Sequence, residues 1–338
     1  MKVYEKSSLN EYHQSLTYDD ISLIPTEISR IKSRKEVNTS LNFLGMKLSI
    51  PVISSPMESV TGIEMARELS SLGCLGIVNR FDSSLNEILN NKNNTRKIYA
   101  ISVALNTPLD TIKKLSEGKK IICIDTANAN NREVLKKSEQ IKNNLKVKLV
   151  VGNIAHGSSL KQLVNAGVDA VRVGIGSGSV CSTSIQTGIG IGQVSSLLDV
   201  YFARQEGKYK IAIIADGGIK GAGDVAKAIA LGADAVMLGR LLAGTRETPG
   251  EVIRYNDQLW KKYRGSASFG VKMKNEFIEG EETMVAYKGA VKNVINAISD
   301  GLRSSMSYMN CQSIEELGLI ETFAVLSNYS YLERLPKP

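Results

Sequence analysis

The sequence predicts a single (β/α)8 barrel, and two observations support this fold. Short apolar runs recur along the 338 residues, and helical segments at 61–72, 131–144, 158–166 and 221–231 lie between them. Runs that are apolar at nearly every position are typical of parallel strands covered on both faces. Their spacing of roughly 20–40 residues per strand and helix suits a closed barrel of eight strands. The expected strands are residues 49–54, 74–79, 98–104, 120–125, 148–153, 170–175, 211–216 and 235–239.

We expect residues 1–338 to form one domain, in which the remaining segments are additions to the barrel. We expect an N-terminal extension at 1–48, a mobile flap at about 265–286 and a C-terminal tail at about 320–338. Residues 81–97 have the pattern of a short helix followed by a polar connection. A doubly wound sheet is the alternative fold, but the GxGxxG turn that follows its first strand is absent from this sequence.

Composition indicates a globular protein of the cytoplasm. Hydrophobic residues make up 43% and charged residues 22% of the chain, which is the balance of a protein with a sizeable core. No apolar run approaches the ~20 residues of a membrane helix, and the N-terminus has no signal-peptide pattern. The four cysteines form no CxxC pair, which fits a reducing compartment.

The net charge of +8 makes nucleic-acid binding a hypothesis to weigh. The lysines are spread over expected helix faces, as at Lys113, Lys114, Lys136 and Lys137, without interleaved aromatic residues. A solvated surface is the simpler interpretation, so we expect no nucleic-acid partner. A positive field still attracts anionic substrates such as nucleotides.

The most informative stretch is residues 171–193, with the sequence VRVGIGSGSVCSTSIQTGIGIGQ. A buried strand leads here into a long loop with glycines on both sides of Cys181. Glycine lets the backbone approach a ligand closely, and successive N–H groups in such a loop form an anion site. A cysteine is most often a small buried apolar residue. Because both flanks of Cys181 are polar and rich in glycine and serine, a nucleophilic thiol is the competing interpretation.

Further notable residues, most of them polar or glycine, lie at the ends of other expected strands. In a barrel, the carboxyl ends of the strands meet on the one face that carries the active site. We therefore expect these residues to lie together. They are Ser55 and Met57 after the first strand, Asp125 at the end of the fourth, Asp216, Gly217 and Gly218 after the seventh, and Gly239 and Arg240 after the eighth.

The Cys181 loop resembles the catalytic loop of the IMP dehydrogenase/GMP reductase family, whose pattern is close to GxGxGSxCxT. The resemblance covers about residues 16–325 and implies a (β/α)8 enzyme that acts on a purine nucleotide, GMP or IMP, and assembles as a homotetramer. The stretches that carry it, in family order, are LTYDDISLIP (16–25), ISSPMESVT (53–61), IDTANA (124–129), VGNI (151–154), ADGGIKGAGDVAKAIALGADAVMLG (215–239), YRGSASFG (263–270) and YKGAVKNVINAISDGLRSSMSY (287–308).

The resemblance assigns catalytic roles to three residues. Cys181 matches the nucleophile that attacks C2 of the purine, and Thr183 matches a hydroxyl that relays a proton. The glutamate that assists the threonine in reductases corresponds to Glu279, with Glu281 and Glu282 close by in the register. The implied substrate-binding residues are Ser55, Met57, Ser179, Asp216, Gly217, Gly218, Gly239, Arg240, Tyr263, Gly265 and Ser268.

Asp216 illustrates how such an assignment competes with a simpler one. By resemblance it accepts the ribose hydroxyls, whereas an aspartate before glycine at a strand end is also common in ordinary turns.

The resemblance also implies a nicotinamide cofactor and, in some members, a potassium ion. The segment that contacts the nicotinamide ribose corresponds to Asp125, Thr126, Ala127 and Asn128, and Asn128 is more typical of reductases. The potassium site corresponds to the carbonyls of Gly176, Gly178 and Cys181.

Two features favour reductive deamination of GMP to IMP and ammonia by NADPH. No regulatory CBS modules interrupt residues 81–97, and residues 265–289 lack the Arg-Tyr dyad with which dehydrogenases activate water. In contrast, residues 242–251 and 263–270 are more similar to dehydrogenases, and Ser266 replaces a methionine common to both branches. The alternatives are therefore an IMP dehydrogenase without CBS modules, which reduces NAD+, and a non-catalytic nucleotide-binding barrel. NADH as the donor and a deoxy or modified purine as the substrate also stay open.

Overall fold

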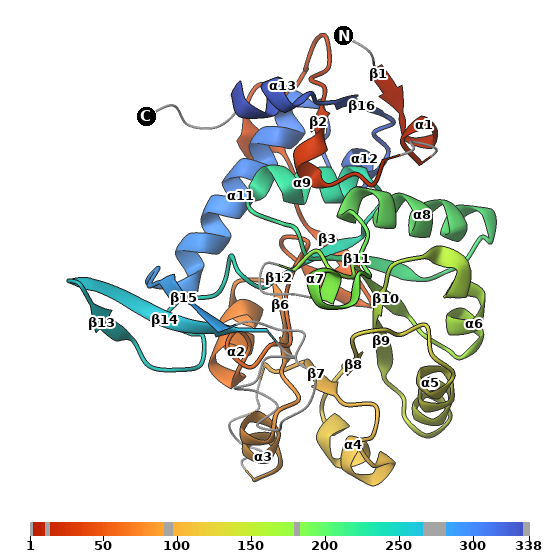
Figure 1. The fold of residues 1–338 in the computed structure, drawn as a ribbon, viewed down its shortest axis with the longest axis vertical. Coiled ribbons are helices and arrows are strands. Elements are labelled where there is room, and N and C mark those ends of the chain that lie inside the picture. The colour runs from red at the N-terminus through yellow and green to blue at the C-terminus, as the bar shows by residue number, and fades with distance from the viewer. Residues whose placement is uncertain (1–2, 11–13, 91–96, 179–182, 266–281, 334–338) are drawn as a thin grey trace.

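Eight parallel strands close into a barrel surrounded by helices (Figure 1). The computed structural model describes residues 3–10, 14–90, 97–178, 183–265 and 282–333. All eight expected strands are present, in the order β10-β11-β12-β5-β6-β7-β8-β9 around the closed barrel. They are β5 (Val52–Ser54), β6 (Leu75–Val78), β7 (Ala100–Val103), β8 (Ile121–Asp125), β9 (Lys148–Ile154), β10 (Ala170–Val173), β11 (Ala212–Asp216) and β12 (Ala235–Leu238).

Helices follow the strands, as the periodicity predicts. α5 (Arg132–Asn144) shows why: the Asn131 side chain accepts the N–H of Glu133 at the helix start, and Val134 and Ile141 are buried on one face. The other helices of the barrel are α2 (Ile63–Ser71), α3 (Asp82–Asn90), α4 (Leu109–Ser116), α6 (Leu160–Asn165) after η4 (Gly157–Ser159), α7 (Thr183–Thr187), α8 (Gln193–Glu206), α9 (Ala222–Ala230) and α11 (Val291–Tyr308).

The interior of the barrel is filled with side chains and is closed at the amino ends of its strands. Alternate strand residues such as Ile121 and Cys123 point inward, and their neighbours Ile122 and Ile124 pack against the helices. A hairpin of β3 (Leu41–Phe43) and β4 (Met46–Leu48) joins the same interior cluster. Since this hairpin covers the amino ends of the strands, the carboxyl ends form the open face.

The C-terminal segment expected as a tail contains a strand. β16 (Thr322–Val325) lies between β1 (Val3–Glu5) and β2 (Ile21–Leu23) in an antiparallel sheet, and its Phe323 is fully buried. The two ends of the described chain are therefore joined in one small sheet, which lies at the top of Figure 1. The short elements around this sheet are α1 (Lys6–Asn10), η1 (Tyr18–Asp20), η2 (Arg34–Glu36), α12 (Ile314–Gly318) and α13 (Asn328–Glu333).

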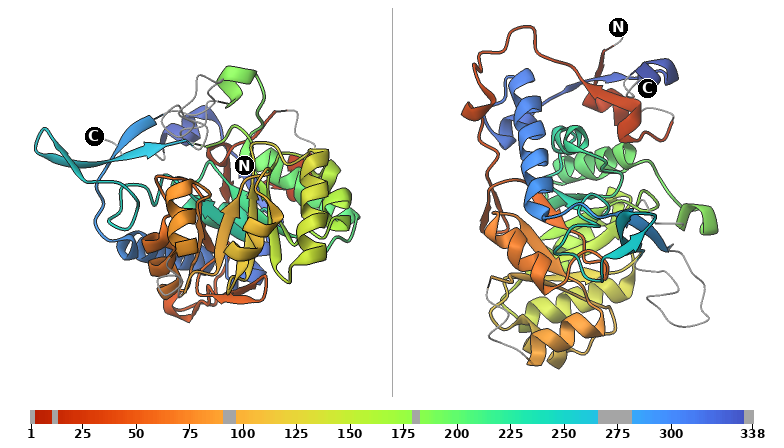
Figure 2. Two further views of the ribbon diagram at one scale, coloured as in Figure 1. Left: turned by 90° about the horizontal axis from the view of Figure 1, so that it is seen from below. Right: turned by 90° about the vertical axis from the view of Figure 1, so that its left-hand side faces the viewer.

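A second antiparallel sheet contains β13 (Ile253–Tyr255), β14 (Gln258–Arg264) and β15 (Glu282–Ala286). Figure 2 shows its β13–β14 hairpin extending away from the barrel. Residues 282–286 of the expected flap form β15, and residues 266–281 lie outside the described part of the chain. Among the described helices, none is both long enough and apolar enough to cross a bilayer.

Candidate active site

The carboxyl ends of β8, β10 and β11 are joined by the buried guanidinium of Arg172. Its Nη1 donates to Asp125 Oδ1 at 2.6 Å, and its Nε and Nη2 donate to Asp216 Oδ2 at 3.0 and 2.8 Å. Arg172 is 6% exposed. One cation thus bridges two carboxylates that we expected to serve separate ligands.

Two further side chains complete this network. Arg80 Nε donates to Asp125 Oδ2 at 2.9 Å, and Asn153 Nδ2 donates to Asp216 Oδ2 at 2.9 Å. Asp216 Oδ2 therefore accepts three hydrogen bonds, while its Oδ1 accepts none from the described residues. Oδ1 is free to accept ribose hydroxyls, the role that the resemblance implies for Asp216.

The opposite charges in this network keep Asp125 and Arg172 ionised. Burial acts to raise the pKa of Asp125, but Arg172 and Arg80 outweigh it and hold that pKa below the ordinary value. Burial likewise acts to lower the pKa of Arg172, and Asp216 and Asp125 raise it well above its ordinary value. Asp125 and Arg172 therefore remain charged at neutral pH.

Residues expected to bind the base and the 5′-phosphate of the nucleotide converge from three elements. Ser55 is 5% exposed, and its carbonyl accepts hydrogen bonds from the backbone N–H of Met57 and the hydroxyl of Thr61. The Tyr263 hydroxyl lies 3.9 Å from the sulfur of Met57. A methyl group added at Gly239 would lie 3.1 Å from the Tyr263 hydroxyl.

The glycines after β11 lie against the loop that follows β10. Gly217 and Gly218 have φ of +107° and +75°, conformations that favour glycine. A methyl group at Gly217 would lie 2.4 Å from the Ser177 hydroxyl, so the two loops touch. Ser177 donates to Gln193 Oε1 at 2.8 Å, which fixes the loop to the start of α8.

The described cysteines are poor nucleophiles. Burial raises the pKa of Cys74 and of Cys123 to about 12, and that of Cys311 to about 11. Their thiols therefore stay protonated at neutral pH. Cys181 and Ser179 lie outside the described residues, directly before α7, which begins at Thr183.

Of the three candidate glutamates, only Glu282, the first residue of β15, lies in the described part of the chain. Glu282 accepts from Arg264 Nε at 2.7 Å and lies 3.4 Å from Lys262 Nζ. Slight burial acts to raise the pKa of Glu282, but Arg264 and Lys262 lower it below the ordinary value. Glu279, Glu281 and Ser268 lie outside the described residues, and Gly265, directly after β14, is buried.

The edge after β8 is accessible to a cofactor. Thr126 pairs with β9 through its N–H, which donates to the carbonyl of Gly152 at 2.9 Å, while Ala127 and Asn128 are exposed. This edge has a backbone held by hydrogen bonds, a carboxylate from Asp125 that can accept hydrogen bonds from hydroxyl groups, and an exposed surface. These features fit the binding of a nicotinamide ribose. Among the described residues, no cluster of three His, Cys, Asp or Glu side chains is arranged to hold a metal ion.

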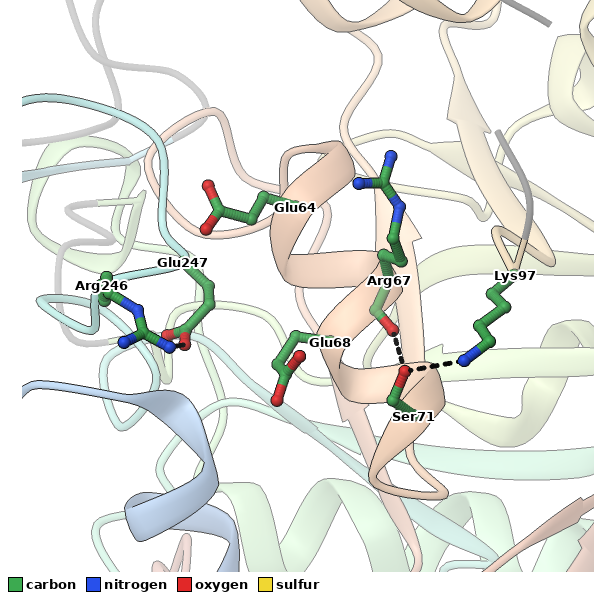
Figure 3. Close-up of a pocket in the computed structure, with 7 residues that line it drawn as sticks. All are labelled: Glu64, Arg67, Glu68, Ser71, Lys97, Arg246 and Glu247. Atoms are coloured by element: carbon green, nitrogen blue, oxygen red, sulfur yellow. Dashed lines mark hydrogen bonds and ion pairs between the residues drawn. The ribbon is translucent and has the colours of Figure 1, made fainter. Parts of the chain in front are cut away.

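A cavity of about 420 Å³ opens beside the loops that follow β10 and β11. Its walls include Tyr18 from η1, Gly176 and Ser177 after β10, and Gly218 and Lys220 after β11. A second cavity of about 330 Å³ lies along the outer side of α2. Figure 3 shows its mixed lining, in which Arg246 pairs with Glu247 and Lys97 donates to Ser71. None of the expected site residues lines it.

Sequence analysis missed Arg172, Arg80 and Asn153. Arg172 had a signal, since a charged residue inside the apolar run AVRV must find a buried partner. Arg80 lies two residues after β6 and Asn153 is the next-to-last residue of β9, but nothing in their local pattern marks them as partners of the two aspartates.

Comparison with known proteins identifies the family of the chain. A family model described as the IMP dehydrogenase/GMP reductase domain matches residues 15–336. The chain is 32% identical to the inosine-5′-monophosphate dehydrogenase of Borreliella burgdorferi, an alignment that covers 96% of both chains. It is 34% identical to the GMP reductase of Lactobacillus gasseri, which covers 93% of this chain and 96% of that one. For the GMP reductase of Staphylococcus aureus, the identity is 33%, over 90% and 94% of the two chains.

Proposed function

We propose that this chain, which belongs to the IMP dehydrogenase/GMP reductase family, converts GMP to IMP and ammonia with NADPH as the reductant. The family consists of oxidoreductases of purine nucleotides. The observation that carries the proposal is the segment between β14 and β15. Arg264 pairs with Glu282 across these strands, so both ends of residues 265–281 are fixed at one place. That segment contains no arginine and no tyrosine.

A dehydrogenase needs a group that activates water at this point. The Arg254-Tyr255 pair does not supply it, because both side chains are exposed on β13, where Arg254 lies 3.5 Å from Asp257. A reductase needs instead a proton donor for the departing ammonia. Glu279 lies in the segment, and Thr183 begins the helix that follows the cysteine loop.

In the proposed reaction, the thiolate of Cys181 adds to C2 of GMP. Thr183 and Glu279 then deliver the proton with which the 2-amino group leaves as ammonia. NADPH supplies the hydride that C2 receives, after which the C–S bond breaks, and IMP and the thiolate are released. Asp216 Oδ1 binds the ribose, and Gly218, Gly239 and neighbouring groups bind the 5′-phosphate.

The other ligands and the assembly of the family form part of the same proposal. Asp125 and residues 126–128 hold the nicotinamide ribose, and the carbonyls of Gly176, Gly178 and Cys181 hold potassium. We further propose a cytoplasmic homotetramer. Light scattering of the purified protein at four times the chain mass, and higher activity in potassium than in sodium salts, are the expected results.

An IMP dehydrogenase is the second candidate, because the match to the Borreliella burgdorferi dehydrogenase covers 96% of both chains. In that case a group other than an Arg-Tyr dyad must activate water.

Substitution of two neighbouring glutamates tests the proposed proton donor. Glu279→Gln is expected to slow the release of ammonia from GMP by about 10²-fold or more, as for loss of a general acid. Glu282→Gln is the matched control and should keep the parent rate, since Glu282 is occupied by Arg264 and Lys262. Ammonia is measured over time with GMP and NADPH. Full activity of Glu279→Gln would remove Glu279 from the mechanism, and loss of activity only in Glu282→Gln would move the role to that residue.

A further inference from the structure

Tyr18 has a buried hydroxyl that no described residue engages. The residue is 2% exposed, and its hydroxyl has no hydrogen-bond partner in the described part of the chain. Tyr18 lines the 420 Å³ cavity together with Ser177, Gln193, Gly218 and Lys220. A buried donor without an acceptor is costly, so the position calls for a ligand atom.

The ring of Tyr18 lies directly against one of the two proposed phosphate glycines. A methyl group at Gly218 would lie 3.4 and 3.5 Å from Cδ2 and Cε2 of Tyr18. At the other glycine, Gly239, an added methyl group would instead meet the hydroxyl of Tyr263, at 3.1 Å. The two tyrosines therefore flank the two strand ends at which the phosphate is expected.

The local structure holds Tyr18 in place from two sides. Lys227 Nζ donates to the backbone carbonyl of Tyr18 at 2.7 Å, and the N–H of Val194 donates to the carbonyl of Leu16 at 3.0 Å. These contacts fix η1 between α9 and the start of α8. Such anchoring presents the hydroxyl at a defined point and lowers the entropic cost of its use.

The phenol is a hydrogen-bond donor under all ordinary conditions. Burial, and then the carboxylates of Asp224 and Asp216, raise the pKa of Tyr18 well above its ordinary value. The hydroxyl therefore keeps its proton, and a phosphate oxygen is a strong acceptor for it.

We infer that the Tyr18 hydroxyl donates a hydrogen bond to the 5′-phosphate of the purine nucleotide. The inference rests on the proposed position of the phosphate at Gly218 and Gly239. It does not depend on the direction of the reaction, because IMP is the product of a reductase and the substrate of a dehydrogenase.

Tyr18→Phe in the full chain tests this role, with Tyr308→Phe as the control because Tyr308 is 66% exposed on α11. The Kd of IMP, measured by calorimetry, should rise about 10-fold or more in Tyr18→Phe, as for a bond to a charged acceptor. Inosine lacks the phosphate, so its Kd, measured by displacement of IMP, should be unchanged. Without ligand, the Tm of Tyr18→Phe should equal or exceed that of the parent, since an unpaired donor has been removed. The control should match the parent throughout.

Three results would overturn the inference. They are an unchanged Kd for IMP, equal weakening of IMP and inosine, and a lower Tm of the ligand-free variant, which would reveal a protein partner of the hydroxyl. Failure of the proposed reductase reaction has a separate signature: IMP binds, and GMP does not support oxidation of NADPH.

Discussion

Arg172 is the residue that organises the candidate site. A buried arginine is tolerated only where its charge is compensated, and here Asp125 and Asp216 supply that compensation at 2.6 and 2.8 Å. Gly152 makes room for it, because a methyl group there would lie 2.3 Å from Cβ of Arg172. The same contacts hold the two carboxylates that we assign to the cofactor and to the substrate ribose.

Removal of Arg172 is therefore expected to destabilise the whole protein. Arg172→Met leaves the buried Asp125 and the partly buried Asp216 without their shared cation, which costs about 3–5 kcal/mol for a broken buried pair. Arg80→Met is the comparison, since Arg80 is 26% exposed and, among the described carboxylates, pairs with Asp125 alone. Urea unfolding of the three proteins should rank the parent first, Arg80→Met second and Arg172→Met third. Equal stability of parent and Arg172→Met would contradict the network.

The same pair predicts a specific dependence on pH. The pKa of Asp125 is held below its ordinary value, so its stabilising contribution is complete above pH ~4 and is lost as pH falls through the folded pKa. In Arg172→Met, burial without this cation raises the pKa of Asp125 relative to the parent, and protonation relieves the penalty. The difference in Tm between the two proteins should thus be largest near pH ~7 and shrink toward pH ~4. A difference that is constant with pH would exclude this ion pair as its cause.

At the scale of elements, strand β16 connects the end of the chain to the segment that carries Tyr18. It pairs with β1 through residues 322–324, and with β2 through residues 323–325. β2 directly follows η1, and the N–H of Leu326 donates to the carbonyl of Asp20 at 2.8 Å. The C-terminal strand thus helps to position η1 beside Gly218.

Phe323→Ala tests this connection. Loss of a fully buried phenylalanine is expected to cost about 3–5 kcal/mol of local stability and to loosen the small sheet. Limited proteolysis should then cut the first 25 residues faster, and the affinity for IMP should fall with it. Tyr329→Ala is the control, because Tyr329 is 83% exposed. Equal rates of cleavage in all three proteins would show that β16 does not hold the N-terminal segment.

At the scale of the whole molecule, the barrel could be predicted because each strand is buried on both faces. A strand that is buried on both faces needs apolar residues at nearly every position, so it appears in the sequence as a continuous apolar run. All eight predicted runs are strands in the structure. The pairing of β16 with β1 and β2 could not be predicted, since it joins residues some 300 positions apart through backbone groups that leave no side-chain pattern.

The candidate site shows the same division. Glycines and aspartates at strand ends have a local signature, and Asp125, Asp216, Gly217 and Gly218 lie at the expected face. The bridge through Arg172 depends on which strands become neighbours, which a local pattern does not contain. Cys181, Ser179, Ser268 and Glu279 lie outside the described residues, so their roles remain predictions.

The direction of the reaction is the central claim, and absorbance at 340 nm tests it most directly. One sample of the purified protein receives GMP and NADPH, and another receives IMP, NAD+ and potassium. We predict a fall in absorbance with release of ammonia in the first sample and no change in the second. A rise in the second sample alone would contradict the proposal and identify an IMP dehydrogenase with a different water activator.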